Sequence, residues 1–411
     1  MSDQPVAGID IHKDFLVVTV LGKDTKKTKE YQTHETDLNH LKRWLARMKV
    51  DKVAMEATGI YMIPCCDKLK DRFELYLVNA ADVRMLPGKK TDILDSEWLA
   101  VLLQKDLLKK SYIPPKEWRD IRELFRQRKG FVHTKSRVKN KVTKILTQEG
   151  FNLSRAFSDV FGKTSRMIID QLVSQKSLKQ ILRDHAENRY VKPNVEVLSC
   201  LPRSKSLSDA ICFVLTLLLD ELDQSQQRID LLDQQLAYMT QEVFQKQSDL
   251  EILKSMPGIS DKIAIGIITE LNSVDRFPSA KHLVSYAGLS PAVYESGGKR
   301  RNKGLNKRGN KYLRTLFIEA AWGASKTKTS RLRQYYHTKR SQKGKKKAIV
   351  ALAAKMMRIA YHLLKYQEMY VEDHFRKNLR NVLLPNNQTS ISLGELDRIL
   401  RSRGLRIATS R

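Results

Sequence analysis

The sequence is poor in cysteine and lacks long apolar runs. Four cysteines stand at Cys65, Cys66, Cys200 and Cys212, and their spacing matches no zinc-binding pattern. We therefore expect a reducing compartment rather than a disulfide-stabilised secreted protein. No apolar run approaches the about 18 residues that a membrane-spanning helix requires. No basic segment followed by an apolar one is found near Met1, as a secretory signal would need. These absences predict a cytoplasmic protein with no membrane partner.

Acidic residues are scarce relative to basic ones. The chain has 75 Lys and Arg against 45 Asp and Glu, a formal net charge of +30. Such an excess is typical of proteins that bind nucleic acid, so we expect association with the nucleoid. The charge is unevenly spread, because residues 1–110 are nearly neutral. Residues 297–347 hold 18 Lys and Arg and a single acid, Glu319. The C-terminal third is therefore the predicted phosphate-contacting region.

The N-terminal quarter alternates short β-branched runs with amphipathic segments. This pattern predicts strands at 6–11, 15–21, about 29–33, 50–56 and 73–79, and helices at 41–48, 60–69 and 92–103. The order of three strands, helix, strand, helix, strand and helix is that of a ribonuclease-H fold. We therefore predict an α/β ribonuclease-H/RuvC-like domain over residues 1–110.

Four carboxylates fall at particular points of this pattern. Asp10 lies within a predicted strand, Glu56 ends another, and Asp92 and Asp95 are three residues apart on one face of a predicted helix. Burying carboxylates at strand ends is costly unless a cation compensates them. Oxygen ligands of this kind suit Mg²⁺, which can stabilise the oxygens of a phosphoryl displacement. The set predicts a Mg²⁺ site for phosphodiester chemistry, although Asp95 alone would more often be a surface charge.

Residues 111–205 are predicted to form a basic helical linker or insertion. The stretch 119–146 carries ten Lys and Arg against two acids, with aromatic residues interleaved. It is either a solvated helix face or a nucleic-acid groove, and the excess of one sign favours the groove. The candidate contacts are Arg126, Arg128, Lys129, Lys135, Arg137, Lys139 and Lys141. Residues 149–205 carry no motif that we can use.

Heptad spacing marks the following segment. Apolar residues recur in steps of three and four over 211–243, which predicts a coiled coil within residues 206–248. The seam can pair with a second chain or pack back within its own chain, and we favour the intermolecular arrangement. A mainly helical domain is predicted over 249–375. It opens on a helix–turn–helix at 251–272, either a phosphate-facing helix–hairpin–helix or an ordinary αα-hairpin. Residues 376–411 are a predicted tail.

Several motifs together resemble the IS110 family of insertion-sequence transposases. GIDIHKD, MEATGIY and GKKTDILDSEWLA look like the motifs of the family's DEDD RuvC-like domain. SMPGISDKIAIGIITEL and the segment from FPSAKHLVSYAGLSP to NKGLNKRGNKYLR resemble its second, serine transposase domain. The resemblance covers about residues 5–110 and 250–365. Its departure is the length of residues 149–205 and of the tail.

The resemblance implies roles that the residues alone do not establish. Ser296, in the ESG motif, would be the catalytic nucleophile, although a Ser before two glycines is by itself most often a turn residue. The surrounding cations would hold the DNA phosphate: Lys299, Arg300, Arg301, Lys303, Lys307, Arg308, Lys311 and Arg314. The family also implies target and donor DNA, a guide (bridge) RNA, and homodimers that assemble into a homotetramer. The active site would then combine the acids of one subunit with Ser296 of another.

Three hypotheses remain at this point. The first is an RNA-guided, Mg²⁺-dependent DNA transposase or recombinase that forms a serine–phosphodiester intermediate. The second is a metal-dependent endonuclease resembling a Holliday-junction resolvase, in which the acids activate water and Ser296 is structural. The third is a catalytically silent nucleic-acid-binding scaffold. The four acids disfavour the scaffold, because they would repel DNA unless a metal ion lies between.

Overall fold

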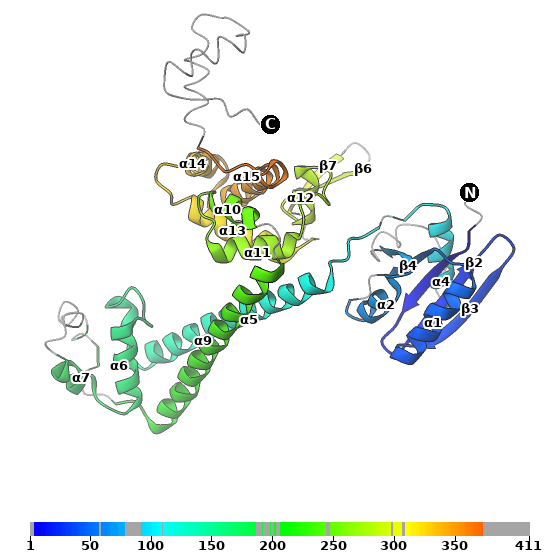
Figure 1. The fold of residues 1–411 in the computed structure, drawn as a ribbon. Helices are drawn as coiled ribbons and strands as arrows, with labels where there is room; N and C mark the ends of the chain where they lie inside the picture. Colours follow the sequence, from blue (N-terminus) through cyan, green and yellow to red (C-terminus); the bar gives the residue numbers. More distant parts are fainter. Residues whose placement is uncertain are drawn as a thin grey trace, which may run out of the picture. The chain divides into compact units, whose positions relative to one another are not determined.

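The chain divides into two compact units, Met1–Pro115 and Lys116–Arg411 (Figure 1). The computed structural model describes residues 4–56, 59–78, 92–108, 110–185, 191, 198, 201–202, 206–243, 247–296, 299–305 and 309–372. The predicted tail, 376–411, lies outside these residues.

The first unit is built on a five-stranded mixed sheet in the order β3-β2-β1-β4-β5. Its elements are β1 (Val6–Ile11), β2 (Phe15–Leu21), β3 (Lys26–Gln32), α1 (Glu35–Arg47), β4 (Lys52–Glu56), α2 (Met62–Leu69), β5 (Glu74–Val78) and α4 (Asp92–Gln104). Strand β1 pairs antiparallel with β2 and parallel with β4. The predicted order of strands and helices is confirmed, because the β-branched runs and the 3.6-residue periodicity of this region are both clear.

The two faces of the sheet carry different cores. Ala7, Ile9 and Ile11 of β1 belong to a cluster that includes Leu41 of α1 and Leu69 of α2. Alternate residues along a strand face opposite sides. Accordingly Val6 of β1 and Ala54 of β4 form a second cluster with Leu99, Ala100 and Leu103 of α4. Among the described residues, α4 therefore covers one face of the sheet, while α1 and α2 cover the other.

The second unit is mainly helical and begins with two long helices. Helix α5 (Lys116–Gln148) lies along α9 (Asp209–Val243) (Figure 1). Leu215 and Leu222 of α9 share a cluster with Val142 of α5, whereas Leu236 of α9 shares another with Phe125 of α5. The two helices are therefore antiparallel. The heptad seam packs within the chain, which is the second of the two arrangements considered for it.

Short helices cap both ends of this pair. At one end lie η1 (Leu153–Arg155), α6 (Lys163–Val173) and α7 (Leu178–Asp184). At the other end a larger bundle contains α10 (Gln247–Lys254), α11 (Asp261–Leu271), α12 (Ala280–Tyr286), α13 (Lys311–Ala324), α14 (Arg331–Lys343) and α15 (Lys345–Tyr366). A two-stranded hairpin of β6 (Pro291–Ser296) and β7 (Lys299–Leu305) stands between α12 and α13.

The turn between α10 and α11 lies directly against α13. Gly258 has φ +87°, and a Cβ at this position would lie 2.3 Å from the backbone O of Ala320 and 2.3 Å from the backbone N of Ala324. Only glycine permits both that conformation and that approach. Through Gly258, this turn packs α10 and α11 onto α13.

Candidate functional site

Asp10 lies one residue before the end of β1, and Glu56 ends β4, the neighbouring parallel strand. The β1–β4 register pairs Gly8 with Ala54 and Ile9 with Met55, so the next step brings Asp10 level with Glu56. Asp10 is two residues beyond Gly8, and Glu56 is two beyond Ala54. Both therefore belong to the face of the sheet that α4 covers. The first two predicted carboxylates are thus brought together by strand register.

The start of α4 lies toward these two residues. Val6 of β1 is clustered with Leu99, Ala100 and Leu103 of α4. A Cβ on Gly8 would lie 2.0 Å from the backbone O of Ser96 and 2.6 Å from the backbone N of Ala100. Along β1 the contacts on α4 therefore move toward its N-terminus. Helix α4 begins at Asp92, one turn before Ser96.

Two buried hydroxyls fix this position of α4. Ser96, which is fully buried, lies 2.8 Å from the hydroxyl of Thr19 on β2, and Thr19 lies 3.0 Å from Thr28 on β3. Sequence analysis missed Ser96 and Gly8. The signal available was a glycine inside the strand VAGIDI, which often marks a close backbone approach.

Asp10 is only 7% exposed and already has a partner. Its Oδ2 lies 3.1 Å from Nε2 of His12, whose ring stacks on Phe15 at 4.6 Å between centroids. The predicted set of four carboxylates offers hard oxygen donors, which fits Mg²⁺, although one partner of Asp10 in the structure is a nitrogen of His12. Among the residues that the structure describes, no three such side chains form a preassembled metal site. The side chain of Asp92 is not among those described.

Ser296 is the last residue of β6. The hairpin register pairs it with Lys299 of β7, and pairs Glu295 with Arg300 and Tyr294 with Arg301. The backbone therefore sets the predicted nucleophile directly across from the predicted basic run. For these hairpin residues and for Lys303 the structure describes the backbone only. Lys307 and Arg308 lie outside the described residues. Lys311 and Arg314 begin α13, and Arg314 donates to the backbone O of Gly288 at 3.5 Å.

Three of the predicted cations of α5 are engaged within the protein. Arg126 donates to both carboxylate oxygens of Glu270 on α11, each at 3.0 Å. Arg128 forms an ion pair with Asp233 of α9, and Lys129 lies 3.8 Å from Glu319 of α13. These contacts join α5 to three other helices.

Glu270 is the centre of this network. It is fully buried and also accepts a hydrogen bond of 2.7 Å from Nδ2 of Asn310, whose Oδ1 caps α13 by accepting from the backbone N–H groups of Tyr312 and Leu313. Burial lowers the pKa of Arg126, but the hydrogen bonds to Glu270, together with the attraction of its charge and of nearby groups, outweigh this and leave the pKa above its ordinary value. Burial lowers the pKa of Lys129.

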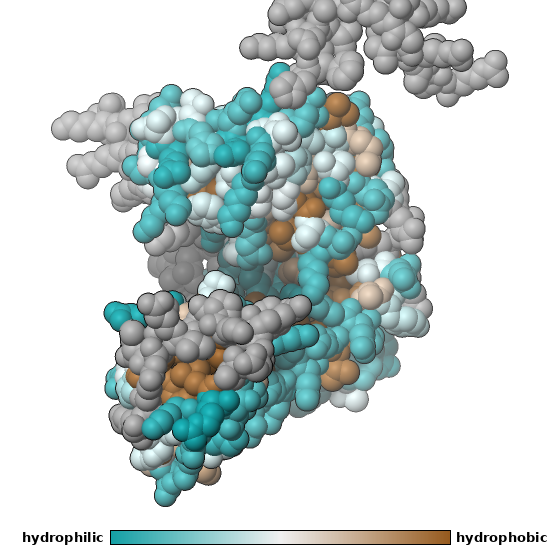
Figure 2. Space-filling model, turned by 90° about the vertical axis from the view of Figure 1, so that its left-hand side faces the viewer, coloured by the Kyte–Doolittle hydropathy of each residue, from teal (hydrophilic) through white to brown (hydrophobic). Residues whose placement is uncertain are grey.

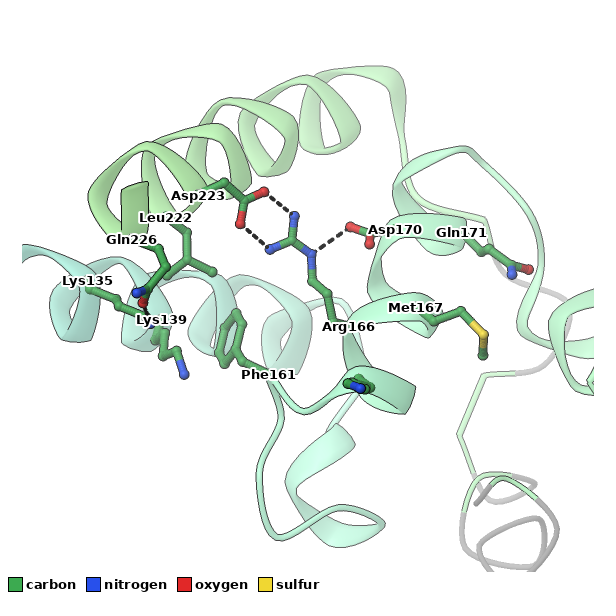
Figure 3. Close-up of a pocket in the computed structure, with 11 residues that line it drawn as sticks. Lys135, Lys139, Phe161, Arg166, Met167, Asp170, Gln171, Leu222, Asp223 and Gln226 are labelled. Carbon is green, nitrogen blue, oxygen red and sulfur yellow. Dashed lines mark hydrogen bonds and ion pairs between the residues drawn. The ribbon is translucent and has the colours of Figure 1, made fainter. Parts of the chain in front are cut away.

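The remaining predicted cations of α5 lie closer to solvent. Arg137 and Lys141 are exposed, whereas Lys135 and Lys139 are half-buried and line a cavity of about 620 Å³ between α5, α6 and α9 (Figure 3). Hydrophilic residues dominate the face of the molecule shown in Figure 2, as the high charge requires. The two ends of α5 therefore differ. The cations of its first half form ion pairs with other helices, whereas those of its second half lie closer to solvent.

A basic groove on the first unit was missed by sequence analysis. It has a volume of about 710 Å³ and lies beside β3 and α1, with five cations among its lining residues: Lys29, Lys42, Arg43, Arg47 and Arg72. The near-neutral total charge of residues 1–110 concealed it. Periodicity could have found Arg43 and Arg47, because they are four residues apart on one face of α1.

No helix among the described residues is long and apolar enough to cross a membrane.

Two family profiles match the chain. One, described as the transposase IS116/IS110/IS902 family, matches residues 250–337. The other, a transposase profile of the DEDD IS110 type, matches residues 7–150. Together they span more than half of the sequence, in the order expected. The chain is an IS110/IS116-family transposase.

Individual relatives agree with this assignment. The transposase resembles the transposase for insertion sequence element IS1111A of Coxiella burnetii, with 24% identity over 90% of this chain and 92% of that protein. It also resembles the pilin gene-inverting protein of Moraxella bovis, with 30% identity over 28% of this chain and 36% of that protein. A solved structure of Thermus thermophilus RuvC matches 26% of this chain and 100% of its own, at 13% identity and a TM-score of 0.21. The protein is a DNA transposase or recombinase.

Proposed function

We propose that this transposase cuts and rejoins DNA through a covalent bond to Ser296, assisted by Mg²⁺ bound at Asp10, Glu56, Asp92 and Asp95. The observation that supports the proposal is the register that brings Asp10 level with Glu56, on the face of the sheet where α4 packs against Gly8. Bound Mg²⁺ would neutralise charge on the scissile phosphate. These four acids would hold it, and no part of the second unit is needed for that.

The covalent step balances without an external energy source. The Oγ of Ser296 forms a bond to phosphorus, the bond from phosphorus to one deoxyribose oxygen breaks, and the serine proton leaves to a general base while the released oxygen is protonated. Rejoining reverses these changes with a hydroxyl from another strand. The phosphodiester energy is kept in the serine ester, so no nucleotide cofactor is consumed.

The basic hairpin supports phosphate binding next to the nucleophile. The backbone register places Lys299 opposite Ser296 and Arg300 opposite Glu295, and the run continues to Arg301 and Lys303. Lys307, Arg308, Lys311 and Arg314 extend the cationic segment to the start of α13. Target and donor DNA are the proposed partners of this surface, because affinity for phosphates scales with the cations that neutralise them.

Guidance by a bridge RNA is part of the proposal. The exposed end of α5, with Lys135, Arg137, Lys139 and Lys141, is its proposed contact. We also propose a homodimer, assembling to a tetramer, in which the acids of one subunit act with Ser296 of another. Four strand cuts in an exchange require four nucleophiles.

Covalent trapping tests the proposal. Purified protein, RNA transcribed from the flanks of its own element, Mg²⁺ and labelled target and donor DNA would be incubated and separated on a denaturing gel. We expect a protein–DNA adduct that requires the RNA and disappears in Ser296→Ala, with RNA binding retained. Asp10→Asn should abolish the adduct in a folded protein.

A resolvase-like endonuclease remains the competing function, since Asp10 and Glu56 lie level on adjacent strands of the first unit. Cut DNA without an adduct, unchanged in Ser296→Ala, would establish that hydrolytic function and contradict the serine mechanism.

A further inference from the structure

The segment without a recognisable motif forms the end of the α5–α9 pair. Leu153, Ile168 and Ile181, from η1, α6 and α7, share a buried cluster with Val142 of α5 and Leu219 of α9. One face of α6 and a loop residue, Phe161, close a cavity of about 620 Å³ against α5 and α9. Figure 3 shows side chains from all three helices directed into this space. The lobe therefore builds a site rather than only a connection.

The acids around this cavity already accept hydrogen bonds from an arginine. Arg166 donates from its Nη1 and Nη2 to the two oxygens of Asp223, at 3.0 and 2.8 Å, and from its Nε to Asp170 at 2.8 Å (Figure 3). The two carboxylates that line the cavity are thus committed to one guanidinium. With Arg166 included, the lining holds four cations against two acids, which leaves a surplus of two positive charges. The cavity favours an anion.

An aromatic ring stands among these cations. The Nζ of Lys139 lies 4.9 Å from the centroid of the Phe161 ring, and Lys135 donates to the side-chain oxygen of Gln226 across the α5–α9 interface. Arg166, held by its edges, has only its planar faces left for a ligand. Aromatic rings and guanidinium planes are the surfaces on which unpaired nucleobases stack, and lysines beside them bind the backbone phosphate.

The lining of the site favours a single strand. A duplex presents mainly its backbone phosphates to a protein surface, whereas an aromatic ring is stacked on by a base that has left its own stack. A volume of about 620 Å³ is ample for a single nucleotide. A base can enter only from a single strand, or after leaving its stack.

We propose that this cavity binds one unstacked nucleotide of a single-stranded nucleic acid, with its base against Phe161 and its phosphate at Lys139 and Lys163. Identifying that strand as the guide RNA rests on the proposed function. A displaced DNA strand has the same base and phosphate chemistry and is the other possible source. The proposal gives the otherwise unassigned lobe a role in holding the strand.

The test uses the full-length protein with fluorescein-labelled 12-nucleotide oligouridine RNA and oligothymidine DNA, followed by fluorescence anisotropy over a range of salt. Phe161→Leu keeps an apolar side chain but removes the stacking surface. We expect it to weaken binding about 5- to 100-fold. Lys163→Gln should lower the slope of log affinity against log salt by about 0.7. Lys179→Gln, which removes an exposed lysine of α7 outside the cavity, is the matched control and should change affinity least.

Photocrosslinking locates the base directly. RNA and DNA oligonucleotides carrying 5-iodouracil would be irradiated with the protein, and the modified peptide identified by mass spectrometry. We expect a crosslink at Phe161. A loss of affinity confined to the RNA oligonucleotide would identify the guide RNA as the ligand. An equal loss of affinity for the DNA oligonucleotide would identify a DNA strand as a ligand. Both support the cavity. Unchanged affinity in Phe161→Leu and Lys163→Gln, with no crosslink in the lobe, would overturn the proposal. These outcomes do not depend on Ser296 adducts, so the two proposals fail separately.

Discussion

At the scale of single residues, Gly8 sets how closely α4 approaches the sheet. A Cβ there would lie 2.0 Å from a backbone oxygen of α4, a contact that no side-chain rotation can relieve. The same helix carries Asp92 and Asp95. The lack of a side chain at Gly8 therefore sets the position of the helix that carries two of the four proposed Mg²⁺ ligands.

We predict that Gly8→Ala displaces α4 and destabilises the first unit by about 1–3 kcal/mol, as overpacking does. Urea denaturation followed by circular dichroism would measure this, and the covalent-adduct assay should show a loss of activity. Gly130→Ala is the matched control. A Cβ at Gly130, within α5, meets nothing within 4 Å, so the change should be neutral or stabilise by up to about 1 kcal/mol. Equal stability of Gly8→Ala and the parent protein would contradict this account of α4.

At the scale of elements, α5 joins the helical pair to the domain that carries Ser296. Its contacts with α11 include the Arg126–Glu270 pair and the ring of Phe125, which lies where a Cβ on Gly266 would be 2.3 Å from its Cζ. Glu270 also holds Asn310 at the start of α13. A buried pair of this kind stabilises little overall, but removing one partner is costly because the other charge stays buried.

We predict that Glu270→Ala lowers the local stability of α11 and the start of α13 by about 3 kcal/mol. Hydrogen exchange of the backbone amides in these helices should accelerate by more than about 100-fold. Asp233→Asn, which weakens the contacts of a partly exposed carboxylate of α9 with Arg128 and Lys262, should cost less than Glu270→Ala, because water can reach Asp233. Exchange rates that change equally in the two variants would show that the burial of Glu270 has no special energetic role.

At the scale of the whole molecule, a second apolar line runs along α9, opposite the face that packs on α5. Phe213, Leu217, Leu231 and Tyr238 are 65%, 53%, 64% and 58% exposed. Their spacing of four, fourteen and seven residues keeps them on one side of the helix. An intermolecular coiled coil would use this line, because the predicted seam is already buried within the chain.

We predict that the double variant Leu217→Asp, Leu231→Asp turns the proposed dimer into a monomer, measured by light scattering. The control adds the same charge at two exposed positions of α14, Thr338→Asp and Gln342→Asp, and should leave the mass unchanged. A parent protein that is itself monomeric, or a double variant that remains dimeric, would contradict a dimer through α9.

The sequence determined the order of strands and helices in the first unit because local periodicity reports which side of each element is buried. It also predicted the four carboxylates as a set, and it contains the concentration of charge after residue 297. Local patterns could not decide which partner a seam selects. The apolar stripe over 211–243 is compatible with pairing to a second chain and with packing inside its own chain. In the structure it packs against α5 of the same chain.

Tertiary structure alone decided which charges remain available to ligands. In the sequence Arg126 and Lys139 are equivalent members of one basic run. The fold brings Glu270, 144 residues away, against Arg126, and brings Phe161 against Lys139. An ion pair depends on distances between segments that are remote in the chain, and a sequence pattern carries no information about those distances. The same holds for Asp10 and Glu56, whose side-by-side register is set by parallel pairing of β1 with β4.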